Sequence, residues 1–193
     1  VSPWNLTSFV FKNVFSLHVV GEKGEWCDYP LFPELFRKAG YHVTFITNQF
    51  LPKAKEAVYD FSGGFFLNHP QLNKQMFDYR NVMIHNYDEN LLNDYKDIIS
   101  YKKPQLIIFH LLGQHFQYSL RCKSNMKKFG IKDYKRMDLT DKEKQTIADY
   151  DNATLYNDFV LNKIVEQFRD KDAIIVYLSD HGEDCYGKDV NMA

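Results

Sequence analysis

The chain has 193 residues, of which 45% are hydrophobic and 16% are aromatic. This composition supports a packed core and excludes an intrinsically disordered protein. The formal net charge of -1 argues against nucleic acid as the partner, because duplex binding usually requires a basic excess. No apolar run reaches the roughly 18–20 residues that a membrane-spanning helix needs. The three cysteines form no CxxC pair, so they indicate neither a zinc knuckle nor a disulfide framework.

The first expected element is a helix over residues 9–17. Asn, Thr and Ser precede this apolar-rich run, which is typical of a helix N-terminus. A hydroxyl group at that end lies beside free backbone N–H groups and the positive end of the helix dipole. Thr7 is therefore a candidate nucleophile, although capping the helix is the more common use of such a residue.

A short helix over residues 33–39 and a strand over residues 41–47 follow, because Pro33 and Gly40 bracket the helix. Gln49 and Lys53 come soon after this strand and are candidates for substrate contact, with a plain turn as the alternative. Residues 50–79 show no clear period and predict a long, partly structured connection over the mouth of the site.

Two more strands are expected at residues 81–85 and 104–109, with a helix over residues 88–99 between them. The second strand leads into His110, and His115 follows five residues later. Ligands of open α/β sheets bind at the carboxyl edge of the strands. The two histidines are therefore site candidates, while an ordinary structural role remains the alternative.

The rest of the chain completes an alternating pattern of helices and strands. Residues 116–138 are rich in Lys and Arg and predict a solvated loop. Thr140 and Glu143 form a capping box, and apolar residues at helical spacing follow as far as Phe168. The order of elements predicts an α/β fold with a mostly parallel sheet flanked by helices.

Residues 173–178 are almost entirely apolar and predict a fully buried strand in the middle of the sheet. Asp180 and His181 follow directly at the strand exit. A carboxylate beside an imidazole suits a zinc-type cation, and Gly182 allows the backbone to turn. A capping Asp and an ordinary loop His are the alternative interpretation.

Three ordered motifs together resemble the catalytic domain of the bacterial phosphoethanolamine transferases, in the sulfatase-like branch of the alkaline phosphatase superfamily. They are His110-x-x-Gly113-x-His115-x-x-Tyr118-x-x-Arg121, Tyr150-Asp151-Asn152-Ala153-x-Leu155-x-x-Asp158 and Ser179-Asp180-His181-Gly182-Glu183. The resemblance covers nearly the whole chain. It implies that residues 1–193 form a single, partial catalytic domain with an alkaline-phosphatase-like fold, a fragment of the full domain.

The resemblance also implies roles for individual residues. Thr7 matches the nucleophile, which takes the phosphoethanolamine group and touches the zinc. Asp180 and His181 match two zinc ligands. His115 matches a histidine that contacts the transferred phosphate, and the other substrate-binding candidates are His110, Gln49 and Lys53. The family's acidic zinc ligand is expected upstream of residue 1.

The implied reaction moves the group from a phospholipid donor to an envelope glycan or lipid acceptor, as in lipid A modification. The implied location is the bacterial inner membrane, with this domain on the periplasmic side and attachment through segments outside this chain. The alternatives that stay open are a phosphoglycerol transferase, a metal-dependent phosphodiesterase or sulfatase-like hydrolase, and a catalytically incomplete fragment. A true sulfatase is disfavoured, because no cysteine has the C/S-x-P-x-R context needed to form formylglycine.

Overall fold

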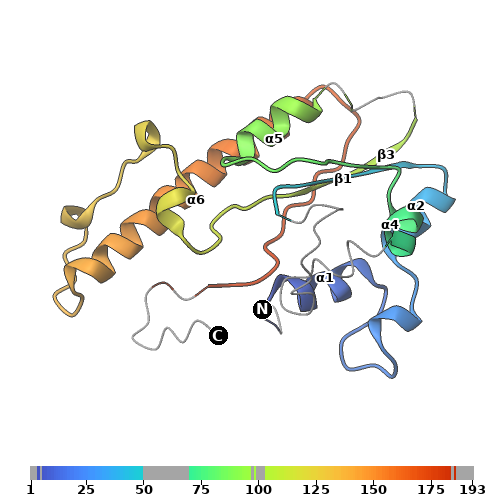
Figure 1. Ribbon diagram of the computed structural model, residues 1–193, viewed down its shortest axis with the longest axis horizontal. Coiled ribbons are helices and arrows are strands. Elements are labelled where there is room, and N and C mark those ends of the chain that lie inside the picture. Colours follow the sequence, from blue (N-terminus) through green and yellow to red (C-terminus); the bar gives the residue numbers. More distant parts are fainter. Residues whose placement is uncertain are drawn as a thin grey trace. The chain divides into compact units, whose positions relative to one another are not determined.

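The computed structural model describes residue 4 and residues 6–49, 70–96, 98, 103–183 and 185 (Figure 1). The chain divides into two compact units. The first comprises Val1–Ile84, Asp97–His110 and Tyr177–Glu183, and the second comprises His85–Lys96, Leu111–Val176 and Asp184–Ala193. Among the described residues, no helix combines the length and the apolar character needed to cross a bilayer.

The first unit contains a parallel sheet whose strands run in the order β2-β1-β3. Its elements are α1 (Thr7–Phe15), a 3-10 turn η1 (Trp26–Asp28), α2 (Phe32–Lys38), β1 (His42–Thr47), α4 (Pro70–Met76), β2 (Tyr79–Arg80) and β3 (Gln105–His110). Figure 1 shows β1 and β3 side by side, and their register pairs His42 with Gln105 and Thr47 with His110. The expected parallel sheet with flanking helices is confirmed.

The core of the first unit lies where α1 packs on the central strand. Phe11 and Phe15 are one helical turn apart, so both face the sheet. The Phe15 ring lies 6.0 Å from that of Phe45 on β1, and Val43 and Phe45 are fully buried. This apolar contact fixes the position of α1, and with it the position of Thr7 at the start of the helix.

The second unit is built around one long helix. Its elements are α5 (Asp88–Tyr95), three 3-10 turns, η2 (Tyr118–Leu120), η3 (Ser124–Met126) and η4 (Ile131–Asp133), and α6 (Asp141–Phe168), against which α5 packs. The expected capping box starts α6: Thr140 N donates to Glu143 Oε2 at 2.6 Å, and Glu143 N donates to Thr140 Oγ1 at 3.3 Å. The buried face of α6 includes Asn152 and Asn157, which an apolar pattern does not reveal.

The strand predicted at residues 81–85 is wrong in position. The strand is Tyr79–Arg80, and Val82 and Met83 are 69% and 54% exposed. The ladder stops because the Asn81 side chain takes over both backbone groups of Thr47 on β1. Asn81 Oδ1 accepts from Thr47 N at 2.9 Å, and Asn81 Nδ2 donates to Thr47 O at 2.6 Å.

The buried strand predicted at residues 173–178 is also wrong. The described residues of this segment join no ladder, and Ile174 and Val176 are 94% and 75% exposed. The segment passes from the second unit to the first between Val176 and Tyr177. An apolar run favours extended backbone, but a strand also needs a hydrogen-bonding partner, and the run itself does not specify one.

The long connection predicted at residues 50–79 contains a helix that the sequence pattern did not reveal, since α4 begins at Pro70. A proline at the first helical position is typical of a helix start. Residues 50–69 lie outside the described part of the chain, so the expectation that the connection covers the site stays a prediction.

Candidate active site

Thr7 and Asp180 are hydrogen-bonded to each other within the first unit. The Thr7 hydroxyl donates to Asp180 Oδ2 at 2.8 Å. Thr7 is the first residue of α1, and the residue at the N-cap position is Leu6, which has no capping side chain. The alternative of an N-capping Thr7 is therefore wrong, because its hydroxyl group contacts a carboxylate from the far end of the sequence instead.

His181 presents a ring nitrogen to the same carboxylate. Its Nε2 lies 3.5 Å from Asp180 Oδ2, and its backbone N donates to Asp180 Oδ1 at 3.0 Å. The other ring nitrogen, Nδ1, lies 3.1 Å from the carbonyl oxygen of Gly182. A carbonyl oxygen can only accept, so in the tautomer with its proton on Nδ1 the ring donates to Gly182, and Nε2 is the nitrogen available to a metal.

The three groups suit a zinc ion in their chemistry. Thr7 Oγ1, Asp180 Oδ2 and His181 Nε2 are oxygen and nitrogen donors, and Asp180 Oδ2 lies 2.8 Å and 3.5 Å from the other two. In a tetrahedral site with bonds of about 2.0 Å, neighbouring ligand atoms lie about 3.3 Å apart. In the part of the chain that the structure describes, no cluster of three His, Cys, Asp or Glu residues is present, so the threonine is needed to complete a set of three donors.

His110 lies at the carboxyl end of β3 and is buried. Its Nδ1 lies 2.9 Å from Thr47 Oγ1 at the end of β1, and its ring lies 4.5 Å from the ring of Phe11 on α1. The same threonine oxygen accepts a hydrogen bond of 3.1 Å from the backbone N of Gln49. The ends of β1 and β3 are thereby joined beneath α1, and His110 supports the helix that carries Thr7.

Arg80 at the carboxyl end of β2 is a feature that the sequence analysis missed. Its guanidinium carbon lies 5.3 Å and 6.0 Å from the ring centroids of Phe45 and Phe77, an arrangement typical of cation–π contact. Burial lowers the pKa of Arg80 to about 10. The side chain nevertheless stays cationic at neutral pH and brings a positive charge to the carboxyl edge of the sheet.

His115 belongs to the second unit and lies on a loop fixed by Asp88. The buried Asp88 carboxylate accepts hydrogen bonds from Leu112 N at 3.1 Å and Gly113 N at 2.9 Å. Gly113 has a φ of 51°, a left-handed conformation that glycine adopts without strain. Arg121 donates to the backbone oxygen of His115 at 3.4 Å. Burial lowers the pKa of Arg121, and the charge of Asp88 opposes this shift.

The structure thus brings together three of the predicted site residues, Thr7, Asp180 and His181. His110 and Gln49 share a hydrogen-bonding partner in the same unit, which is Thr47. Lys53 lies outside the described residues. Thr47 and Asp88 were not predicted as site residues. Thr47 is the last residue of an expected strand and Asp88 is the first residue of an expected helix, and in α/β folds ligands bind near the carboxyl ends of strands.

Comparison with known proteins identifies the family. Residues 5–192 match the sequence profile of the family described as Sulfatase. Phosphoethanolamine transferase EptC of Escherichia coli K12 is 33% identical over 161 residues, which are 81% of this chain and 27% of EptC. The Kdo(2)-lipid A phosphoethanolamine 7''-transferase of the same organism is 36% identical over 78 residues, which are 40% of this chain and 14% of that enzyme.

A solved structure supports the fold over almost the whole chain. The crystal structure of the C-terminal periplasmic domain of Escherichia coli EptC in complex with Zn has a TM-score of 0.75 and 27% sequence identity, and the match covers 95% of this chain and 51% of that one. The alkaline-phosphatase-like fold expected from the sequence is thereby confirmed. The chain spans about a quarter of the length of the first curated relatives.

Proposed function

The chain belongs to the sulfatase family, and from that membership we propose that residues 1–193 are part of one catalytic domain of a zinc-dependent phosphoethanolamine transferase. The donor is a phospholipid, and the acceptor is an envelope lipid or glycan. This choice follows from the two relatives described above. Both are named as phosphoethanolamine transferases, and the name of one of them also specifies Kdo(2)-lipid A.

The observation that carries this proposal is the contact between the Thr7 hydroxyl and Asp180 Oδ2 at 2.8 Å. In the proposed reaction, Thr7 Oγ1 attacks the phosphorus of the donor, and the hydroxyl group gives up its proton as the new bond forms. The bond between phosphorus and the diacylglycerol oxygen breaks, and the leaving oxygen takes up a proton. A phosphoethanolamine ester of Thr7 results.

In the second step, a hydroxyl group of the acceptor attacks the phosphorus of this ester. The bond to Thr7 Oγ1 breaks, and the threonine recovers a proton as the acceptor loses one, so that the enzyme returns to its initial state. Zinc, when bound by Thr7, Asp180 and His181, supplies a positive charge that favours the threonine alkoxide and neutralises phosphoryl oxygens. His115 and Gln49 are proposed substrate contacts, as is Lys53.

The proposed location is the periplasmic face of the bacterial inner membrane. The support is the solved EptC domain, which is described as periplasmic.

The first test is the zinc content of the intact protein, measured by elemental analysis for the wild type, Asp180→Ala and Asp170→Ala. Asp170 is an exposed carboxylate just beyond α6 and serves as the matched control. We expect about one zinc per wild-type and control chain and a loss of zinc in Asp180→Ala. Absence of zinc from all three proteins would remove the metal from the proposal.

The second test traps the covalent step with a phosphatidylethanolamine donor and no acceptor. Peptide mass spectrometry should then find one phosphoethanolamine group on Thr7. Release of free phosphoethanolamine at the same rate with and without an acceptor would instead identify a hydrolase. Transfer of glycerol phosphate in preference to phosphoethanolamine would identify a phosphoglycerol transferase.

A further inference from the structure

A stretch of the second unit concentrates positive charge. Residues 121–136, called the basic loop below, contain seven Lys or Arg residues and one Asp, although the whole chain has a net charge of -1. A density of this kind is normally either balanced by nearby carboxylates or left to face an anionic partner. The ion pairs of the loop decide between these two cases.

Part of the positive charge of the basic loop is balanced and part is not. Lys123 pairs with Glu89, Lys127 lies 3.6 Å from Asp149, and Arg136 lies 2.6 Å from Asp138. The remaining lysines of the loop are Lys128, Lys132 and Lys135, and all three are exposed. Within the described part of the chain, none of them has a carboxylate within 4 Å. Three lysines that lack a close carboxylate therefore lie within residues 128–135, a stretch whose single carboxylate is Asp133.

The backbone of the basic loop is held to α6 by hydrogen bonds to the buried side chain of Asn152. Asn152, which is 1% exposed, accepts from Lys128 N at 2.7 Å and from Phe129 N at 2.9 Å, and it donates to Phe129 O at 2.9 Å. One turn of 3-10 helix later, the Tyr134 hydroxyl donates to Asp151 at 2.6 Å. Asp151 and Asn152 of α6 thus fix the backbone of this loop. Binding a partner through the loop therefore costs little backbone conformational entropy.

Apolar side chains lie among and next to these lysines. Met137 is 93% exposed and Phe129 is 36% exposed. Contacts to phosphodiester backbones are made by cationic and polar groups, so such a partner would leave the exposed methionine without a contact. The combination does suit the interface of a bilayer, where cations meet anionic headgroups and apolar side chains enter the acyl boundary.

We infer that the basic loop is a docking surface for an anionic lipid surface, with Lys128, Lys132 and Lys135 as the headgroup contacts and Met137, the residue directly after the loop, as the apolar contact. The inference rests on the proposed function, since a donor and an acceptor that are both embedded in a membrane require the domain to approach that membrane. It extends the function by naming the residues that bring the domain to its substrates.

The test is co-sedimentation of the chain with vesicles of phosphatidylcholine, with or without added phosphatidylglycerol. The variant Lys128→Gln/Lys132→Gln/Lys135→Gln is compared with a control of equal charge change, Lys103→Gln/Lys142→Gln/Lys171→Gln, whose lysines are also exposed. Each lysine at an anionic surface contributes roughly five-fold to affinity, so the loop variant should bind anionic vesicles about 100-fold more weakly. The control should bind like the wild type.

Two further variants sharpen this test. Met137→Gln should weaken vesicle binding at high salt, where screening removes most of the electrostatic attraction. Thr7→Ala should bind vesicles like the wild type even if group transfer is lost, which separates a failure of docking from a failure of the proposed reaction. The inference would be overturned if the chain bound both vesicle types equally or if the two triple variants lost equal affinity. It would also be overturned if the loop bound RNA more tightly than vesicles.

Discussion

Asn81 and Thr47 exchange a reciprocal pair of hydrogen bonds, in which the side chain of one residue satisfies both backbone groups of the other. A third bond runs from Asn81 Nδ2 to Met83 O at 2.6 Å. Asn81 is fully buried. The Asn81 side chain therefore takes the place of a further β2 residue beside Thr47, where the backbone pairing of β1 with β2 has already ended. Thr47 lies at the same edge of the sheet as His110.

Asn81→Ala should lower the free energy of unfolding by about 2–4 kcal/mol, because it removes three hydrogen bonds and leaves buried backbone groups unpaired. Urea denaturation measures the change. Asn13→Ala is the matched control: its single bond, from Asn13 Nδ2 to Phe9 O, is solvent-exposed, so that substitution should cost less than about 1 kcal/mol. Equal losses in the two variants would contradict a special role for Asn81.

Asp78 should make the stability of the protein depend on pH. Burial alone would raise the pKa of Asp78, but the hydrogen bond from Val43 N at 2.8 Å and the hydrogen bond and charge of Arg37 lower it below its ordinary value of 3.8. A lowered pKa in the folded state adds stability above pH 3.8, and this stability is lost as the pH falls through the folded-state pKa.

The stability difference between the wild type and Asp78→Asn should therefore be largest near neutral pH and should shrink below pH 3.8. Thermal unfolding at several pH values measures it. Asp133→Asn removes an exposed carboxylate that caps a 3-10 turn and provides the control curve. A wild-type advantage that stays constant into the acid range would show that Asp78 contributes through shape rather than charge.

Asp88→Ala should loosen the loop that carries His115. Hydrogen exchange at the amides of Leu112 and Gly113 should become faster, because both amides lose the carboxylate that accepts their hydrogen bonds. If His115 contacts the transferred phosphate, KM for the donor should rise more than kcat falls.

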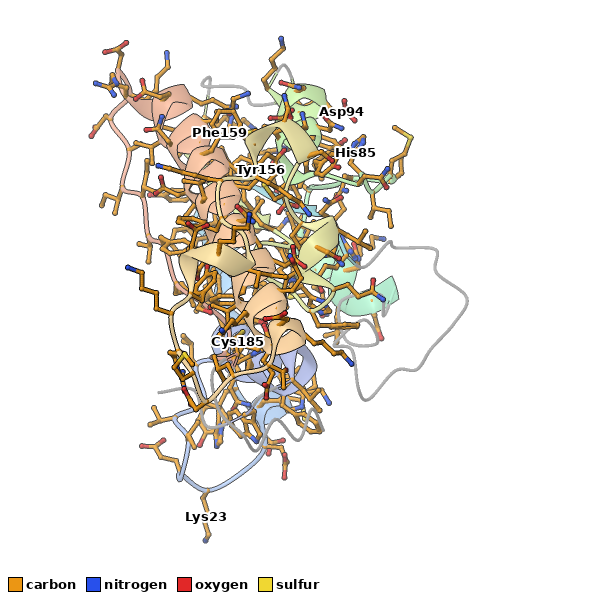
Figure 2. All side chains as sticks on the ribbon, turned by 90° about the vertical axis from the view of Figure 1, so that its left-hand side faces the viewer. Lys23, His85, Asp94, Tyr156, Phe159 and Cys185 are labelled. Carbon is orange, nitrogen blue, oxygen red and sulfur yellow. The ribbon has the colours of Figure 1, made fainter. Side chains whose placement is uncertain are left out.

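Asp94→Ala is the control for this loop. Asp94 lies on the same helix and pairs with His85 at 2.7 Å (Figure 2), whereas the hydrogen bonds from residues 112 and 113 go to Asp88. Its removal should leave the exchange of the two loop amides unchanged. Faster exchange in both variants would mean that α5 as a whole had become unstable.

Thr7→Ser should retain most of the proposed transferase activity, since a serine hydroxyl group can make the same hydrogen bond to Asp180. Thr7→Ala should reduce turnover on the order of a thousand-fold or more, because no nucleophile remains. Steady-state kinetics with a phosphatidylethanolamine donor measure both. Thr146→Ala, which removes an exposed hydroxyl group on α6, should have no effect, and activity in Thr7→Ala would exclude Thr7 as the nucleophile.

The elements that were predicted correctly are those whose signals are local. The capping box at Thr140 is complete within four residues, and β3 contains an unbroken apolar run at residues 106–109. The end of β2 was misplaced because it depends on Asn81, whose partner Thr47 is 34 residues away in the sequence. No periodicity of apolar residues reports such a contact.

The candidate site was predictable as a set of residues but not as an arrangement. The adjacency of Asp180 and His181 is visible in the sequence, whereas their contact with Thr7 joins positions 173 residues apart. The supporting groups were missed because buried polar side chains such as Thr47 look like ordinary strand residues until their partners are known. Asp88 was identified only as a helix start, although its carboxylate holds the loop of His115.

The pairing of β1 with β3 also determines when the first unit can form during synthesis. Thr47 and His110 are 63 residues apart. Because a ribosome adds roughly 5–20 residues per second, β3 is synthesised roughly 3–13 s after β1. During this interval the apolar side chains of Val43, Phe45 and Ile46, all fully buried in the finished sheet, have no cover from β3. The nascent chain is therefore most vulnerable to aggregation before β3 emerges, and a chaperone that binds extended apolar segments would protect it at that stage.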